Sequence, residues 1–259
     1  MRLTVLGGCG AWPTALEACS GYLVEHEGFS LLVDPGYATF PRLLRYGDAD
    51  TVDAVLVSHG HPDHCADLHP LLRARALSDA PPAPLPVHAP HGALDAVLAL
   101  DRPGMLAGAY RRHDFTPGDR FEIGPFTVST RLLPHFVPNA GLRIATPDAV
   151  LAYTGDTGPS DEIARLAEGA DVFLSEATYV HQVPEADARY LLTARLAGRY
   201  ATRAGVARLL LTHLWPGTDP ATAHAAAAEL FAGPVAVAAP DLVLGVGTAA
   251  PQRGPRHPA

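Results

Sequence analysis

One short segment, S-H-G-H-P-D-H-C at residues 58–65, constrains this chain more than any other part of its sequence. It contains His59, His61, Asp63 and His64, and imidazoles and carboxylates are common ligands of metal ions. The apolar run before the segment predicts a buried strand, and the residues after it predict a helix. The segment therefore predicts a metal site in a loop at the carboxyl end of a strand. A solvated histidine-rich turn is the alternative for this segment taken alone.

Three later segments each place a metal-ligand type of side chain just after a predicted strand. His135, Asp156 and His213 all follow such strands within a few residues. Loops at the carboxyl ends of strands can converge on one crevice, which is where α/β proteins usually bind ligands. The four segments together predict one site formed by His59, His61, Asp63, His64, His135, Asp156 and His213.

Apolar runs rich in β-branched residues alternate with helical patterns along the chain. Strands are predicted at residues 3–6, 21–25, 30–33, 54–57, 126–133, 150–153, 172–175 and 209–212. Helices are predicted at residues 38–46, 66–76, 92–100, 160–167, 188–204 and 220–231. This mixture indicates an α/β protein with sheets inside and helices outside. We predict one domain over residues 1–247, with a proline-rich connector at 80–86 and a flexible tail at 248–259.

Composition limits the partners and the compartment. The formal net charge is −8 and no basic run occurs, which argues against a large nucleic-acid surface without ruling one out and favours a small-molecule substrate. No stretch approaches the roughly 20 apolar residues of a membrane span, and no secretory signal precedes the glycines at 7 and 8. The three cysteines form no C-x-x-C pair, which is typical of a reducing compartment. We therefore expect a cytoplasmic protein that does not contact a membrane.

The order of these motifs resembles the metallo-β-lactamase superfamily over nearly the whole chain. The resemblance rests on H-x-H-x-D-H at 59–64, the later His135, G-D-T-G at 155–158 and T-H at 212–213. The D-P-G segment at 34–36 also resembles an Asp-x-Gly segment of that superfamily, which supports the metal site from outside its ligand set. The resemblance implies an αββα sandwich of two mixed sheets flanked by helices, with a dinuclear metal site at one edge.

The resemblance also implies a role for each ligand. The first metal would be bound by His59, His61 and His135, and the second by Asp63, His64 and His213. Asp156 would bridge both metals, and Asp63 would in addition act in catalysis by orienting the nucleophile. These imidazole and carboxylate ligands suit two divalent ions, Zn²⁺ first, with Mn²⁺ and Fe as alternatives.

The position of Asp156 resembles some branches of the superfamily more than others. A bridging carboxylate resembles the phosphodiesterase, ribonuclease Z and glyoxalase II branches, whereas antibiotic-hydrolysing relatives typically place cysteine or serine there. The glycine-rich segment 6–13 and the S-E-A-T-Y segment at 175–179 resemble the ribonuclease Z-like group. The L-T-H-L-W-P segment at 211–216 resembles bacterial members that open 3′,5′-cyclic nucleotides.

Two departures argue against a tRNA-processing enzyme. Ser175 replaces a histidine that those enzymes use near the scissile phosphate, and the segment between His135 and Asp156 is too short for their tRNA-gripping arm. We therefore predict a phosphodiesterase acting on a small phosphodiester, such as a 3′,5′-cyclic nucleotide, through a hydroxide that bridges two metals. The alternatives are a tRNA 3′-processing endonuclease, a hydrolase of an ester, thioester or lactone, and a non-catalytic metal-binding scaffold. By resemblance we also expect a homodimer.

Four further residues have weaker hypotheses attached. Arg143 is a candidate phosphate clamp, with an ordinary surface arginine as the alternative. His181 is a candidate proton donor in place of the missing histidine. Glu176 and Thr178 are expected to brace the metal loops through hydrogen bonds.

Two aromatic residues close to the predicted site have two interpretations each. Trp12 follows the glycine-rich segment and Tyr179 ends the S-E-A-T-Y segment. Either ring could stack on a base, or it could pack in the core or at the rim of the site.

Overall fold

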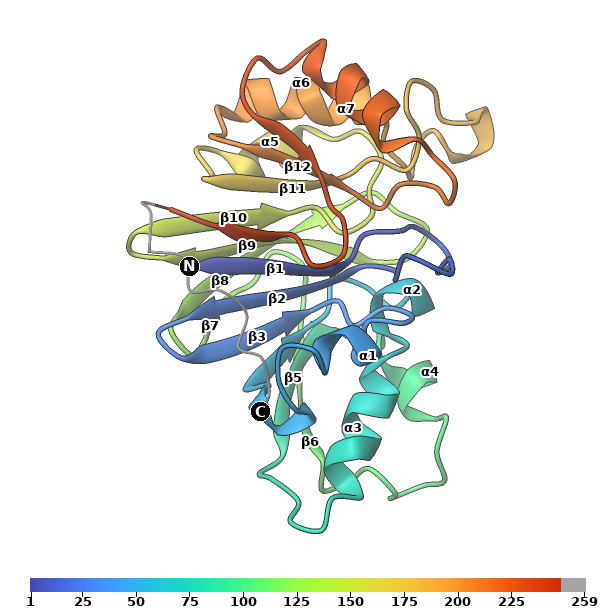
Figure 1. The fold of residues 1–259 in the computed structure, drawn as a ribbon, viewed down its shortest axis with the longest axis vertical. Helices are drawn as coiled ribbons and strands as arrows, with labels where there is room; N and C mark the ends of the chain where they lie inside the picture. Colours follow the sequence, from blue (N-terminus) through green and yellow to red (C-terminus); the bar gives the residue numbers. More distant parts are fainter. Residues whose placement is uncertain (248–259) are drawn as a thin grey trace.

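The computed structural model describes residues 1–247, in which two seven-stranded sheets pack face to face between outer helices (Figure 1). The predicted tail at 248–259 lies outside the described residues. The arrangement of helices, sheet, sheet and helices confirms the αββα sandwich of two mixed sheets.

The first sheet has the strand order β14-β1-β2-β3-β4-β5-β6. Pairing is antiparallel from β14 to β3 and parallel from β3 to β6. In chain order the strands are β1 (Arg2–Gly7), β2 (Gly21–His26), β3 (Phe29–Val33), β4 (Ala54–Leu56), β5 (Leu85–Pro90), β6 (Tyr110–Phe115) and β14 (Val243–Gly245).

The second sheet has the strand order β13-β12-β11-β10-β9-β8-β7. Pairing is antiparallel from β7 to β10 and parallel from β10 to β13. In chain order the strands are β7 (Arg120–Ile123), β8 (Phe126–Leu133), β9 (Asn139–Thr146), β10 (Ala149–Tyr153), β11 (Val172–Glu176), β12 (Leu209–Thr212) and β13 (Val235–Val237).

The helices cover the two outer faces of the sandwich (Figure 1). Those on the first sheet are α1 (Phe40–Leu43), α2 (Pro62–Cys65), α3 (Leu68–Ala76) and α4 (Asp95–Leu98). Those on the second sheet are α5 (Asp161–Ala167), α6 (Ala194–Ala204) and α7 (Pro220–Ala228). Short 3₁₀ turns occur at Ala49–Thr51 and Glu185–Asp187. None of the described helices is long and apolar enough to cross a membrane.

Three apolar layers hold this arrangement together. The central layer joins the two sheets and includes the fully buried rings of Tyr22, Phe126 and Tyr153. A second layer lies between the second sheet and α5, α6 and α7, and a third lies between the first sheet and its helices. Burial of apolar area in these layers is the main favourable contribution to folding.

Helix α6 shows how local sequence sets an element and its packing. Its first turn is capped by Thr193, whose side chain accepts a hydrogen bond from the backbone of Leu196, and it ends at Gly205 in the left-handed conformation. Gly198, a poor helix former, lies against α7. A Cβ there would stand 2.2 Å from the carbonyl oxygen of Ala227, so only glycine allows the two helices to pack this closely.

All eight predicted strands are present, and β8 and β12 have the predicted bounds. The patterns did not predict β5, β6, β7, β9, β13 or β14. The connector predicted at 80–86 is partly wrong, because β5 begins at Leu85. Within β5, the neighbouring strand β4 pairs only with Val87 and His88. The prolines of β5, which have no N–H group to donate, therefore interrupt no hydrogen bond to β4. The helix predicted at 188–204 begins only at Ala194, and the one predicted at 38–46 shortens to α1.

Candidate metal centre

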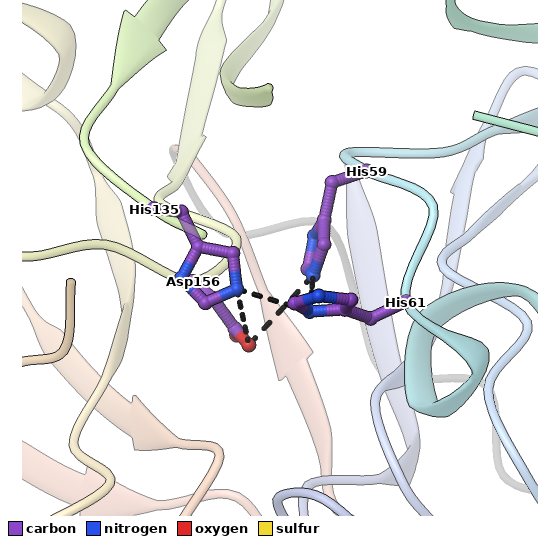
Figure 2. A group of neighbouring side chains, drawn as sticks. All are labelled: His59, His61, His135 and Asp156. Carbon is purple, nitrogen blue, oxygen red and sulfur yellow. Dashed lines mark hydrogen bonds and ion pairs between the residues drawn. The ribbon is translucent and has the colours of Figure 1, made fainter. Parts of the chain in front are cut away.

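The fold brings the seven predicted ligands together at one end of the sandwich. The motif histidines and Asp63 follow β4, while the other three ligands follow β8, β10 and β12. Their side-chain donors form two groups, each with its atoms within 4.8 Å of one another. The groups are His59, His61, His135 and Asp156, and Asp63, His64, Asp156 and His213. Asp156 belongs to both, and Figure 2 shows the first group pointing inward around its carboxylate.

The donor atoms are packed closely. Nδ1 of His61 lies 3.1 Å from Nε2 of His59 and 3.0 Å from Nε2 of His135. Nε2 of His213 lies 3.2 Å from an oxygen of Asp63 and 3.2 Å from an oxygen of Asp156. Such a cluster of lone pairs and negative charge is unfavourable unless something positive lies among the atoms.

The hydrogen-bond network assigns the tautomers of two of these histidines directly. Nδ1 of His135 lies 3.0 Å from the carbonyl oxygen of Tyr190, which can only accept, so this nitrogen carries the proton. Nδ1 of His64 lies 2.8 Å from the carboxylate of Asp34 and donates to it in the same way. When either ring is neutral, its Nε2 has a lone pair that faces the site.

His59 is assigned through a relay that begins at the same carboxylate. The hydroxyl of Ser58 donates to Asp34 over 2.6 Å, so its oxygen accepts from Nδ1 of His59 at 3.0 Å. The proton therefore sits on Nδ1, and Nε2 of His59 presents a lone pair to the site.

A second relay assigns His213. The hydroxyl of Thr178 donates to Glu176 over 2.6 Å, so its oxygen accepts from Nδ1 of His213 at 3.0 Å. Glu176 is fully buried, and burial raises its pKa to about 7. Its oxygens also accept backbone N–H groups of Thr157 and Leu192, which favours the ionised carboxylate. Glu176 and Thr178 thus brace the site through hydrogen bonds, as expected from the sequence.

Two buried atoms test directly whether the site suits a cation. Nε2 of His64 and Oδ1 of Asp156 are 3.2 Å apart, yet neither makes a hydrogen bond with any described residue. Buried polar atoms without partners are costly and rare in native proteins. A cation bound by both atoms would satisfy them, so the donor set fits divalent metal ions.

The pKa directions agree with this arrangement. Burial lowers the pKa of His59, His61 and His135, which keeps these rings neutral and able to bind a metal. Burial also opposes charge on His64 and His213, but the carboxylates of Asp156 and Asp63 raise the pKa of both rings, that of His64 well above the usual value. Without a metal, protons on these two rings take the place of the cation, so metal binding would release protons.

Asp34 anchors the network from a strained position. It is fully buried with a positive φ of 48°, a conformation that aspartate tolerates better than most residues. Its carboxylate accepts from the backbone N–H and hydroxyl of Ser58, from His64 and from the hydroxyl of Tyr153. These four bonds offset the strain and set the direction of two rings of the site.

Gly36, in the same D-P-G segment, supports Asp63 by close approach. A Cβ at this position would stand 1.8 Å from the carbonyl oxygen of Asp63, so Gly36→Ala must push the metal loop away. We expect a loss of about 1–3 kcal/mol in unfolding free energy and a lower metal content. Urea unfolding and elemental analysis measure both. Gly245→Ala, where no atom lies within 4 Å, is the matched control, and an equal effect of the two changes would contradict this role of Gly36.

Three other residues considered in the sequence analysis have different environments. Arg143 donates to the carbonyl oxygens of Leu166 and Glu168 at the end of α5, so the hypothesis of a phosphate clamp is wrong. Ser175, which stands where the tRNA-processing enzymes have a histidine, is fully buried, and its hydroxyl donates to the carbonyl oxygen of Glu176. His181 is exposed to solvent, and its role as a proton donor stays a prediction.

Three residues that serve the site were not singled out from the sequence. Ser58 stands directly before the motif, so its position was an available signal. Tyr153 donates to Asp34 from inside an apolar strand, and Tyr190 contributes only a backbone carbonyl. Neither of these two shows a sequence pattern that points to the site.

Comparison with known proteins agrees with the site. Residues 29–214, more than half of the chain, match the family described as the beta-lactamase superfamily domain. The chain belongs to this superfamily. The probable metallo-hydrolase YhfI of Bacillus subtilis is 32% identical over 221 residues, which cover 83% of this chain and 87% of YhfI. The crystal structure of YhfI aligns with a TM-score of 0.85 at 31% identity and covers 94% of this chain and 98% of that one.

A further relative is the ribonuclease Z of Kineococcus radiotolerans. It is 31% identical over 285 residues, which cover 88% of this chain and 90% of the relative. The predicted superfamily is therefore confirmed. Its members and the donor groups support the broader prediction of a metal-dependent hydrolase.

Proposed function

We propose that this protein is a phosphodiesterase that acts on a small phosphodiester, such as a 3′,5′-cyclic nucleotide. It would use two divalent cations, with Zn²⁺ as the preferred metal and Mn²⁺ or Fe as alternatives. The observation that carries the proposal is the convergence of four assigned Nε2 lone pairs on two groups that share Asp156. A shared carboxylate suits two neighbouring cations, and two-metal sites are common in enzymes that cleave phosphodiesters.

The residues divide into the two groups that the geometry defines. His59, His61 and His135 would hold one cation, and Asp63, His64 and His213 would hold the other, with Asp156 between them. When bound, the two cations would make a water molecule more acidic and neutralise charge on the phosphoryl oxygens.

Asp63 has a second role in this proposal. Its Oδ2 accepts a hydrogen bond from the backbone N–H of Ala11 over 2.9 Å, which fixes the direction of the carboxylate. The side chain is almost fully buried, so it reaches the site rather than bulk solvent. Asp63 would therefore orient the attacking water as well as bind a cation.

Two alternatives remain in the same superfamily. The ribonuclease Z relative favours an endonuclease acting on tRNA, but the net charge of −8 and the short segment between His135 and Asp156 argue against it. A hydrolase of an ester, thioester or lactone needs the same metal chemistry, because carbonyl carbon is attacked in the same way as phosphorus. We propose a small-molecule substrate, with nucleic acid as the less favoured alternative, no membrane partner, and a homodimer.

The proposal is tested with metal-analysed protein on bis(p-nitrophenyl) phosphate and 3′,5′-cyclic AMP in parallel, with Asp156→Ala as the inactive control. We expect turnover of both compounds by the wild type and none by the variant. Wild-type protein that holds two metals per chain but cleaves neither compound would contradict the proposal. Esters, thioesters and lactones would then be the substrates to screen.

A further inference from the structure

Three aromatic side chains, Trp12, Tyr179 and Trp215, form a continuous wall beside the candidate metal centre. The ring of Trp12 packs edge-on against Trp215 with centroids 5.0 Å apart, and Trp215 stacks on Tyr179 at 5.9 Å and 16°. Trp12 is 49% exposed and Trp215 38% exposed. Exposed large apolar side chains that are contiguous usually mark a binding surface. We call these three residues the aromatic wall.

Hydrogen bonds join the aromatic wall to residues of the metal centre. The backbone N–H of Ala11, next to Trp12, donates to the carboxylate of Asp63 over 2.9 Å. The backbone N–H of Trp215 donates to the carbonyl oxygen of Thr178 over 3.2 Å, and the side chain of Thr178 holds a histidine of the site. The wall is therefore fixed relative to the predicted ligands, and rigid aromatic surfaces bind planar groups at a low entropic cost.

The chemistry of the aromatic wall selects the kind of group that it can bind. The loops at 8–12, 177–180 and 213–217 contain no Lys, Arg, Asp or Glu. A second phosphate or a polyanion needs cationic partners, which these loops lack. An uncharged planar ring needs only a π face, and every nucleobase presents one.

We propose that the aromatic wall is a subsite for the nucleobase of a nucleoside phosphodiester whose phosphate is bound at the metal centre. This inference rests on the proposed phosphodiesterase function and specifies its substrate class. A second copy of the chain is a poorer occupant, because a stable dimer buries about 1,200–2,000 Å² and three partly exposed rings supply only a small part of that area.

The chain offers a direct binding readout, because its two tryptophans are both in the wall. Titration of metal-loaded wild-type protein with adenosine 5′-monophosphate should quench the intrinsic tryptophan fluorescence. Ribose 5-phosphate, which has the same phosphate and sugar without the base, should leave it unchanged. Neither compound contains a phosphodiester, so hydrolysis does not disturb the titration. Equal quenching by the two compounds, or none by either, would overturn the proposal.

Kinetics give the second readout. Trp215→Leu should raise KM for 3′,5′-cyclic AMP by about 5- to 150-fold, the range expected for one stacked base, with kcat changed by less than about twofold. KM for methyl β-D-ribofuranoside 3′,5′-cyclic phosphate, which lacks the base, should stay unchanged, and Trp215→Phe should keep most of the affinity for cyclic AMP. An equal loss on both substrates would show that Trp215 only supports the metal loops, and would overturn the proposal.

The two readouts separate the subsite from the reaction. If adenosine 5′-monophosphate alone quenches fluorescence but the wild type cleaves no phosphodiester, the subsite stands and the proposed function fails. If both cyclic phosphates are cleaved equally well and no quenching occurs, the function stands and the subsite fails. A third outcome is that the wild type shows no quenching and Trp215→Leu sediments differently from the wild type. The aromatic wall would then be a contact between copies of the chain, and the proposal would be overturned.

Discussion

Replacing Asp156 with alanine is expected to remove metal from both groups at once and to lower phosphodiester hydrolysis by about a thousandfold or more, which is roughly 4 kcal/mol of barrier. Asp156 is the one residue shared by the two groups, and its carboxylate lies between His64 and His213. Without Asp156 the cation of the second group would be lost, and the buried Nε2 of His64 would then have no partner. Elemental analysis after dialysis and initial rates measure the two effects.

Variants that affect one group serve as matched controls for Asp156. His135 belongs only to the first group and His213 only to the second, so each alanine variant should retain the metal of the other group. Circular dichroism shows whether each variant is folded before its metal content is compared. Equal metal contents in Asp156→Ala and His135→Ala would show that Asp156 does not bridge two cations.

The metal centre was easier to predict from the sequence than the sheets that carry it. Its seven side chains lie in the segments that follow four strands, and these segments meet at one end of the sandwich. The strands that the sequence patterns did not predict are stabilised by pairing with neighbouring strands rather than by local sequence. β5 contains prolines that normally oppose a strand, and it is stabilised by pairing along its whole length with β6.

Residues that act through tertiary contacts were the hardest to predict. Arg143 follows His135 closely in sequence, but β9 carries it away from the site. It lies four residues beyond Asn139 at the start of that strand, about 13 Å at the usual rise. Tyr153 contacts Asp34, a residue far away in the chain, and only the packing of one sheet on the other brings them together. The sequence around either residue does not predict such tertiary contacts.

Asp34 gives the second large prediction, because one buried carboxylate positions two rings of the site. Asp34→Ala would leave buried donors of Ser58, His64 and Tyr153 without their acceptor. Removing one partner from a buried charged network costs about 3–5 kcal/mol, so we expect a large loss in unfolding free energy. Urea unfolding of metal-free protein measures this effect separately from metal binding.

Asp34→Asn separates the position of the ring from the stability of the fold. Asparagine tolerates the positive φ and keeps one acceptor oxygen, so the loss of stability should be smaller than for alanine. When the NH₂ group of the asparagine faces His64, it donates to Nδ1 of the ring. The ring proton then lies on Nε2, which no longer has a lone pair to bind the cation. We expect metal affinity to fall by about 10- to 100-fold, as measured by competition with a chromogenic chelator.

The control variant is Tyr153→Phe, which removes one donor to Asp34 but leaves the hydrogen bond between Asp34 and His64. It should lower stability while metal affinity stays near that of the wild type. Unchanged affinity in Asp34→Asn would mean that Asp34 supports the fold without setting the tautomer of His64.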